Sequence, residues 1–299
     1  MALVCEDLAR YGVVLIPPST EKYFDLLADI ERRLQIKPKG SLPVENDTIS
    51  RISEHDTGGS AILLNRAQVA IASVAYIWSF RHRNGRIIPH QFTPGTNASV
   101  LLPFGLNDQV RKFDAFWNTI FPGSKRLMTA DGHWYGDNTD VRAPAEDELW
   151  HGGFFSMSGG SRNDLDEPVK LTLDGVFFVD GGFAGPNRLG AWEHTVFAAE
   201  AHLVCAALAR ESREKATPSD VFFVRVQQLT GQTDEARLPP PPPPRSPESG
   251  LPDLESIRKY EQQIVGWEVL EMRKRLGDNA AIVTIHAWSD APGPKLHRL

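Results

Sequence analysis

The sequence contains very little cysteine. Cys5 and Cys205 are the only two in 299 residues, and no Cys-x-x-Cys pair or His/Cys zinc spacing occurs. This excludes a disulfide framework and a zinc centre as the source of stability. Cys205 falls between Val204 and Ala206 in a helical pattern, where a small buried thiol is expected. The sequence therefore predicts a fold held by a hydrophobic core, without a metal or cofactor.

An excess of positive charge is also lacking. The 32 Lys and Arg residues are outnumbered by 38 Asp and Glu, for a formal net charge of -6, and no dense basic stripe interleaved with aromatic residues occurs. Attraction to a phosphate backbone requires such a stripe. We therefore predict that nucleic acid is not a partner.

Long hydrophobic runs are missing from the N-terminal segment. The apolar run from Val13 to Ile16 is followed by Pro17 and Pro18. It is far shorter than the apolar region of a signal peptide or a membrane-spanning helix. The sequence predicts no membrane association and a cytoplasmic location.

Motifs of known catalytic centres are missing as well. No G-x-S-x-G, HExxH or kinase signature occurs, and no G-x-G-x-x-G or GxxxxGK pattern opens a helix after a strand. No residue set amounts to a specific catalytic signature.

Extended segments are indicated in the middle of the chain. Residues 61–64 and 69–80 are apolar runs, the second rich in β-branched and aromatic side chains, and Asn84-Gly85 follows. Asn-Gly between extended runs predicts a hairpin with a type I′ turn, in which both residues have positive φ. Alternation along 69–80 places Val69, Ile71, Ala75 and Ile77 on one face and Val74, Tyr76, Trp78 and Phe80 on the other. A strand with two apolar faces is predicted to be covered on both sides.

Further strands are predicted over 98–105, 124–136 and 170–179, with a long loop over 136–168. The stretch VFFVDGGFAGPN, residues 176–187, combines an apolar run with clustered glycines. Asp-Gly-Gly supplies the positive φ angles of a tight turn, and Gly185-Pro186-Asn187 ends the extended segment. We interpret the stretch as a turn between strands.

Helical patterns flank this region. Residues 19–35 and 188–214 have helical spacing of apolar residues, and 220–229 fits either a helix or a strand. Asp253 or Ser256 can cap a helix that runs to residue 276 and ends at Gly277. The alternation over 279–290 predicts one last strand.

A run of six prolines, Pro239 to Pro244, predicts a stiff polyproline II spacer. Together with the strand and helix patterns, this run divides the chain into five predicted parts: an N-terminal helix and connector (1–59), a β-sandwich core (60–187), a helical extension (188–238), a proline-rich linker (239–250), and a C-terminal helix and strand (251–299).

The segments LLNRAQVAIASVAYIWSFRHRNGR and KLTLDGVFFVDGGFAGPN together resemble bacterial proteins with an immunoglobulin-like sandwich. In these proteins a short strand, an Asn break, a long strand bearing a Trp and a Gly hairpin recur. The resemblance covers about residues 60–187 and implies a mainly β fold with α-helices: an antiparallel immunoglobulin-like β-sandwich with flanking helices. It implies no activity and no site residues.

Two groups of residues are candidates for binding. Glu193 and Glu200 fall between apolar rows of the 188–214 helix: Trp192, Val196, Leu203 and Ala207 in one row, and Phe197, Val204 and Leu208 in the other. A carboxylate in such an arc is paired, partly exposed or functional. His194 and His202 project to other sides of the helix, so no Glu-x-x-His metal pair is formed.

The second group is the turn-rich stretch ADGHWYGDNTD, with His133, Trp134, Tyr135 and Asp137 as candidates for binding a cation or stacking a sugar. Core packing of the aromatic residues is the structural alternative.

These observations leave two hypotheses. The first is a non-enzymatic binding or assembly protein that meets a protein partner through its C-terminal helix, which could instead pack back on the body. The second is a carboxylate-dependent, possibly carbohydrate-active hydrolase, which requires two carboxyl groups about 5 to 10 Å apart. The oligomeric state is not determined by the sequence.

Overall fold

The computed structural model describes the chain in several segments: residues 2–4, 8–35, 59–92, 119–130, 134–136, 167–233, 239–243, 252–290 and 295–299. The contacts divide the chain into two compact units. We call the described residues up to Pro186, together with His297–Leu299, the β unit. The described residues between Asn187 and Leu296 form the helical unit.

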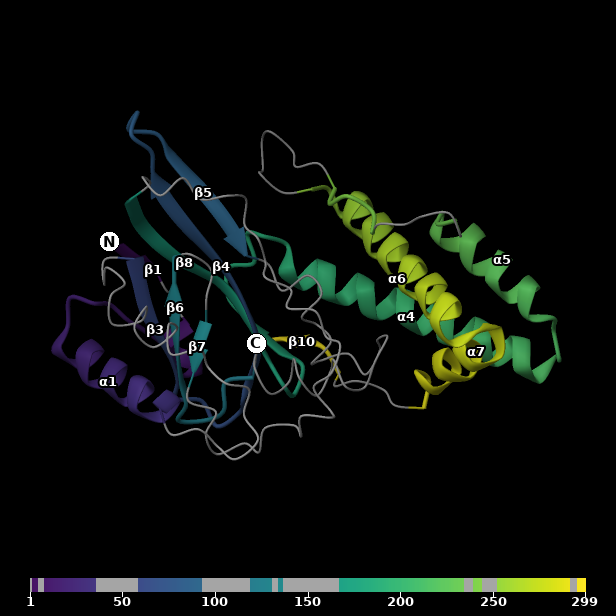
Figure 1. Cartoon of the computed structure of the whole chain (residues 1–299), viewed down its shortest axis with the longest axis horizontal. Helices are drawn as coiled ribbons and strands as arrows, with labels where there is room; N and C mark the ends of the chain where they lie inside the picture. Colours follow the sequence, from purple (N-terminus) through teal and green to yellow (C-terminus); the bar gives the residue numbers. More distant parts are fainter. Residues whose placement is uncertain are drawn as a thin grey trace. The chain divides into compact units, whose positions relative to one another are not determined.

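The β unit contains two sheets (Figure 1). The first has the strand order β10 (His297–Arg298), β9 (Gly182–Ala184), β8 (Glu167–Phe178), β4 (Ile71–Arg81) and β5 (Ile87–Phe92), and β1 (Ala2–Val4) also pairs with β8. The second has the order β2 (Val13–Ile16), β3 (Ser60–Asn65), β6 (Lys125–Thr129) and β7 (Trp134–Gly136). All pairings are antiparallel except β1 with β8 and β10 with β9.

A shared hydrophobic core joins the two sheets. It includes Ala61 and Leu63 of β3, Trp78 of β4 and Leu171 of β8, all fully buried. The opposite face of the second sheet packs against α1 (Glu21–Gln35), whose Tyr23 and Ile30 contact Ile62 and Leu127. The predicted 19–35 helix is thus confirmed, and its apolar stripe covers a sheet.

The register of β4 corrects the predicted division of its faces. Ile71 belongs to the core with Val74, Tyr76, Trp78 and Phe80, and not to the face of Ala75 and Ile77. The pairing of β4 with β8 shifts between Ile71 and Ser73. A bulge at this point adds one residue, which reverses the face of everything before it.

The predicted hairpin is confirmed, but its turn differs from the expected type. The amide of Gly85 donates to the carbonyl of His82, and the amide of His82 donates to the carbonyl of Arg86. Gly85 has a φ of 78°, whereas Asn84 is not among the residues with positive φ. The loop is therefore a three-residue turn ending in a left-handed glycine, in which Asn84 accepts a bond from the Arg86 amide.

The glycine-rich stretch at 176–187 does form a turn. β8 and β9 are antiparallel, Gly181 has a φ of 90°, and its amide donates to the carbonyl of Phe178. Gly175 and Gly185 lie close to neighbouring groups: a Cβ on Gly175 would lie 2.4 Å from the Phe183 ring, and one on Gly185 would lie 2.5 Å from the Asp174 carbonyl oxygen. Glycine is required at both places, because β9 and the residues after it pass so close to β8, its neighbour in the sheet, that a Cβ would not fit.

The helical unit consists of α4 (Ala191–Glu214), α5 (Ser219–Thr230), α6 (Leu254–Leu276) and α7 (Asp278–Ala287) (Figure 1). The helix over 188–214 and the capping of the C-terminal helix are confirmed: Asp253 accepts from the Ser256 amide, and Gly277 follows the last turn. The ambiguous segment at 220–229 is helical.

The last predicted strand, over 279–290, is wrong, because this segment forms α7. The apolar residues of this segment fit both the helical and the strand period. The buried ones, Ala281, Ile282 and Ile285, have helical spacing. Packing against α4 and α6 favours the helix, and Arg273 bonds Asp278 at its start.

Other sequence predictions lie outside the described residues, namely the strand over 98–105 and most of the loop over 136–168. Pro239–Pro243 form neither helix nor strand. Among the helices that the structure describes, none combines the length and apolar character that crossing a bilayer requires.

Asn65 organises the connection between β3 and β4. Its side-chain amide donates to the carbonyls of Val69 and Ile120, at 3.0 and 2.8 Å, and its oxygen accepts from the Ala67 amide. The residue is fully buried. The Asn65 side chain therefore links the end of β3 to the connection at residues 67–69 and to the backbone at residue 120.

We expect Asn65→Ala to lower the free energy of unfolding by on the order of 3 kcal/mol, because it leaves buried carbonyl and amide groups without partners. Urea unfolding followed by tryptophan fluorescence measures the change. Asn84→Ala, which removes one exposed bond in the hairpin loop, is the matched control. Equal losses in the two variants would contradict the role assigned to Asn65.

Candidate functional site in the helical unit

The structure places Glu193 at the start of α4. Its carboxylate accepts a hydrogen bond from the side-chain amide of Asn187 at 2.5 Å, while the Asn187 oxygen accepts from the Trp192 amide at 2.9 Å. Asn187 has a φ of 61°, a left-handed conformation that Asn tolerates. Glu193 thus takes part in fastening the first turn of α4.

Glu200 lies two turns further along α4 and is exposed. Seven residues of helix separate the Cα atoms of Glu193 and Glu200 by about 10 Å along the axis. Because Glu193 already binds Asn187, only Glu200 presents its carboxylate freely to solvent on this part of the helix.

The remaining sequence candidates belong to the β unit. Trp134 and Tyr135 lie in β7, an edge strand, where they pair with Met128 and Leu127 of β6. His133 and Asp137 lie outside the described residues.

The buried face of α4 differs from the predicted apolar rows. Leu203 and Val204 are 48% and 43% exposed. The buried residues are mostly small or polar: Ala191, Thr195, Ala198, Ala201, His202, Cys205, Ala206, Ala209 and Ser212. Small side chains let neighbouring helices approach closely, which explains why this face and not the bulkier one is packed.

Two histidines on this side of α4 meet two glutamates of α6. Nδ1 of His194 lies 2.6 Å from Oε1 of Glu261, and Nε2 of His202 lies 3.1 Å from Oε2 of Glu268. All four side chains are at most 21% exposed. We call these four residues the His–Glu layer. The order of the two contacts shows that α4 and α6 run in the same direction.

The His–Glu layer must hold protons. Nδ1 of His202 lies 2.7 Å from the Ala198 carbonyl oxygen, which can only accept, so this nitrogen carries a hydrogen. The contact between Nε2 and Glu268 then needs a second proton, on the imidazole or on the carboxyl. The contact between His194 and Glu261 likewise requires one proton between its two atoms.

Burial raises the pKa of two groups in or beside this layer, Glu261 and Cys205. It raises the pKa of Glu261, an effect opposed by the hydrogen bond from His194 and reinforced by the charge of Glu268. Burial, with the Glu268 charge, also raises the pKa of the Cys205 thiol to about 12. Cys205 is therefore a neutral thiol, which agrees with the buried thiol expected from the sequence and gives it no nucleophilic character.

The His–Glu layer pairs α4 with α6 through hydrogen bonds between buried side chains. Across the described part of the chain, no three His, Cys, Asp or Glu side chains are grouped as metal ligands. The rings of Trp288, which follows α7, and His202 meet edge to face with their centroids 5.0 Å apart, so Trp288 covers the His202 ring on that side.

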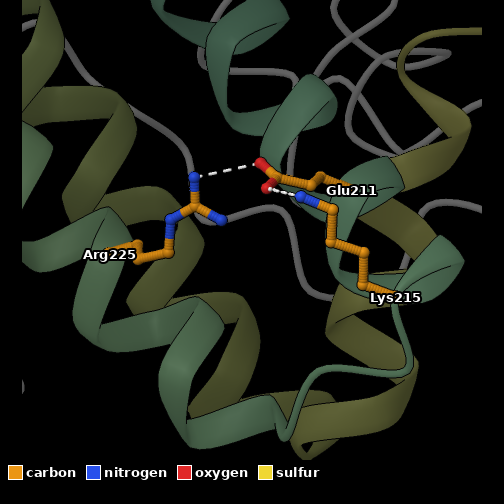
Figure 2. Close-up of polar contacts among 3 residues, drawn as sticks. All are labelled: Glu211, Lys215 and Arg225. Atoms are coloured by element: carbon orange, nitrogen blue, oxygen red, sulfur yellow. Dashed lines mark hydrogen bonds and ion pairs between the residues drawn. The ribbon is translucent and has the colours of Figure 1, made fainter.

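A second polar cluster fastens α5 to α4 at the surface (Figure 2). Glu211 accepts from Lys215, the residue that caps the end of α4, at 2.8 Å and from Arg225 of α5 at 3.0 Å. These two hydrogen bonds, with the positive charges behind them, lower the pKa of Glu211 to about 2. The cluster is exposed and salt-screened, which limits its contribution to stability.

The sequence contains a weak signal for the His–Glu layer. The histidines are eight residues apart on α4 and the glutamates seven apart on α6, so both pairs span two helical turns. Similar spacing on two helices predicts cross-helix pairs only once the two helices are known to be neighbours.

Comparisons with protein families, with curated proteins and with solved structures gave no match to this chain.

We expect Cys205 to resist alkylation in the folded protein. With a pKa of about 12, the reactive thiolate is about one part in ten thousand at pH 8. Peptide mass spectrometry after iodoacetamide treatment, with and without denaturant, measures labelling at this residue. Native labelling as fast as that of the denatured chain would show that the α4–α6 interface does not hold the thiol as described.

We expect Glu261 to make stability depend on pH. A carboxyl group whose folded pKa is raised contributes stability below its usual value of 4.5 and loses that contribution as the pH rises through the folded value. The wild type should therefore lose more stability than Glu261→Gln as the pH rises above 4.5.

Thermal unfolding followed by far-ultraviolet circular dichroism over this range tests the expectation. Glu255→Gln changes an exposed carboxylate of the same helix and should run parallel to the wild type. A Glu261→Gln profile that is also parallel to the wild type would refute the assignment.

Proposed function

We propose that this chain is a non-enzymatic binding or assembly protein whose helical unit provides the contact surface. The observation that carries the proposal is the exposure of large apolar side chains on this unit. They lie on α4, α5 and α7 and are each 40% to 51% exposed: Leu203, Val204, Val221, Val224, Leu229 and Val283.

Exposed apolar side chains of this size favour association. Full burial of a Val or Leu side chain contributes about 1.5 to 3 kcal/mol, and single exposed residues are ordinary, whereas neighbouring ones such as Leu203 and Val204 favour a contact surface. The indication of a contact surface is strongest on α4, because small and polar residues occupy its packed face while the larger Leu203 and Val204 face outward.

The charges on the exposed face of α4 favour a second copy of the chain as the partner. At 100° per residue, Glu200, Leu203, Ala207 and Arg210 share one face, and all four are exposed. If two α4 helices cross antiparallel about a twofold axis at the level of residue 205, Glu200 of each copy faces Arg210 of the other. Leu203 of each copy then faces Ala207 of the other, and the small Ala207 side chain leaves room for Leu203.

The C-terminal helix takes part through the unit to which it belongs. Val265, Val269 and Leu270 of α6 are buried within the helical unit, and α6 packs against α4. We therefore propose that the helix after the proline run supports the contact surface by holding α4 in place.

The scaffold that we propose for the β unit is an immunoglobulin-like sandwich. Two largely antiparallel sheets with one shared core support it, as does the fully buried Trp78 on a central strand. The parallel pair of β10 with β9 is an addition to that plan.

Sedimentation velocity over a range of concentrations tests the assembly proposal. We expect a dimer for the wild type, a dissociation constant at least tenfold larger for Glu200→Arg, and recovery in the double variant Glu200→Arg, Arg210→Glu, because the swap restores opposite charges across the twofold axis. Glu255→Arg makes the same charge change on the exposed side of α6 and should have no effect.

A monomer at every concentration would contradict self-assembly. A dimer that none of the α4 substitutions weakens would place the contact elsewhere.

A further inference from the structure

The β unit contains a cleft of about 320 Å³. Three segments far apart in the sequence line it: the short 3₁₀ helix η1 (Leu8–Tyr11), Phe183 of β9 with Gly185 and Pro186 after that strand, and the C-terminal residues Arg298 and Leu299. The volume falls in the range of small-molecule sites in proteins.

The floor of the cleft is apolar. Leu8 is fully buried and Phe183 is 2% exposed. The Phe183 ring is held in place from behind, because it contacts Phe177 with ring centroids 4.7 Å apart and occupies the space left by Gly175. The floor is therefore formed before any ligand arrives.

Backbone pairing fixes the two sides of the cleft. Leu299 donates its amide to the carbonyl of Phe183 at 2.9 Å, and His297 donates to that of Gly181 at 3.1 Å. On the other side, the Gly12 amide donates to the Ala9 carbonyl and closes η1. The glycine-rich stretch at 176–187, which forms the turn between β8 and β9, thus also forms one wall of the cleft.

Two arginines carry positive charge at the rim. The Arg10 guanidinium lies 4.7 Å from the centre of the Tyr11 ring, a cation–π contact that orders the side chain. Arg298 lines the cleft from β10. Both residues are exposed. A guanidinium presents parallel N–H donors that match a carboxylate.

We propose that this cleft binds a small organic carboxylate with an apolar body, such as an aryl or short alkyl acid. The apolar body packs on the accessible lining residues Tyr11, Pro186 and Leu299. The carboxylate lies at the rim between Arg10 and Arg298. The site is independent of the contact surface on α4.

Benzoate titrated into the full-length protein tests the proposal by calorimetry and ligand-observed NMR. We expect saturable binding with a dissociation constant on the order of 1 mM, as befits a ligand of this size. Benzyl alcohol, which keeps the ring and lacks the charge, should bind at least tenfold more weakly.

Arg10→Gln and Arg298→Gln should each weaken benzoate binding at least tenfold, whereas Arg83→Gln should leave it unchanged. Arg83 is exposed in the β4–β5 loop and gives the same loss of charge in the same unit. Because all three arginines are exposed, unchanged melting temperatures are expected and confirm that the variants are folded.

Three results would overturn the proposal: no saturable benzoate binding, equal weakening by Arg83→Gln, or equal binding of benzyl alcohol. Phenyl phosphate and inorganic phosphate serve as competing anions. Binding of either phosphate without binding of benzoate would also overturn the assignment to a carboxylate.

Discussion

The close pairing of α4 with α6 is the constraint on which the helical unit depends. α4 can approach its neighbours closely only through small side chains, so Ala198, Ala201 and Ala209 face inward. The same face carries His194 and His202, and burying these rings requires partners, which Glu261 and Glu268 supply. The larger Leu203 and Val204 are left on the outside.

One choice of packing face thus has two results. It creates a buried polar layer that must hold protons, and it leaves an apolar surface toward solvent. The polar layer also specifies the register of the two helices, because a slip of one residue would separate both histidines from their glutamates at once. The interior of the helical unit and its proposed contact surface are therefore consequences of the same sequence pattern on α4.

Local signals in the sequence predicted local structure well. The caps at Asp253 and Gly277 and the apolar spacing over 19–35 identified their helices, and Asn84-Gly85 identified a hairpin. The short segment at 279–290 was mispredicted because its apolar residues fit both periods, and packing against other helices decided between them. The face of Ile71 was misplaced because one bulge, which has no sequence signature, reverses the alternation.

The candidate sites were less predictable, since each depends on which distant segments become neighbours. The similar spacing of the histidines on α4 and the glutamates on α6 becomes informative only once the two helices are known to be neighbours. The cleft combines residues near 8, 183 and 298, which no local motif connects. Glu193 and Glu200 were correctly recognised as unusual, although the structure engages the first with Asn187 and exposes the second.

The pairing of β10 with β9 gives the chain a further property. Residues 187–296 lie between two strands that are neighbours in one sheet, so the helical unit is an insertion with both of its ends held by the β unit. When the helices unfold, their chain becomes a closed loop and not a free tail, and its conformational entropy is correspondingly reduced. As long as residues 297–299 remain paired in the sheet, they restrict the unfolded chain of the helical unit and so raise the free energy of its unfolded state.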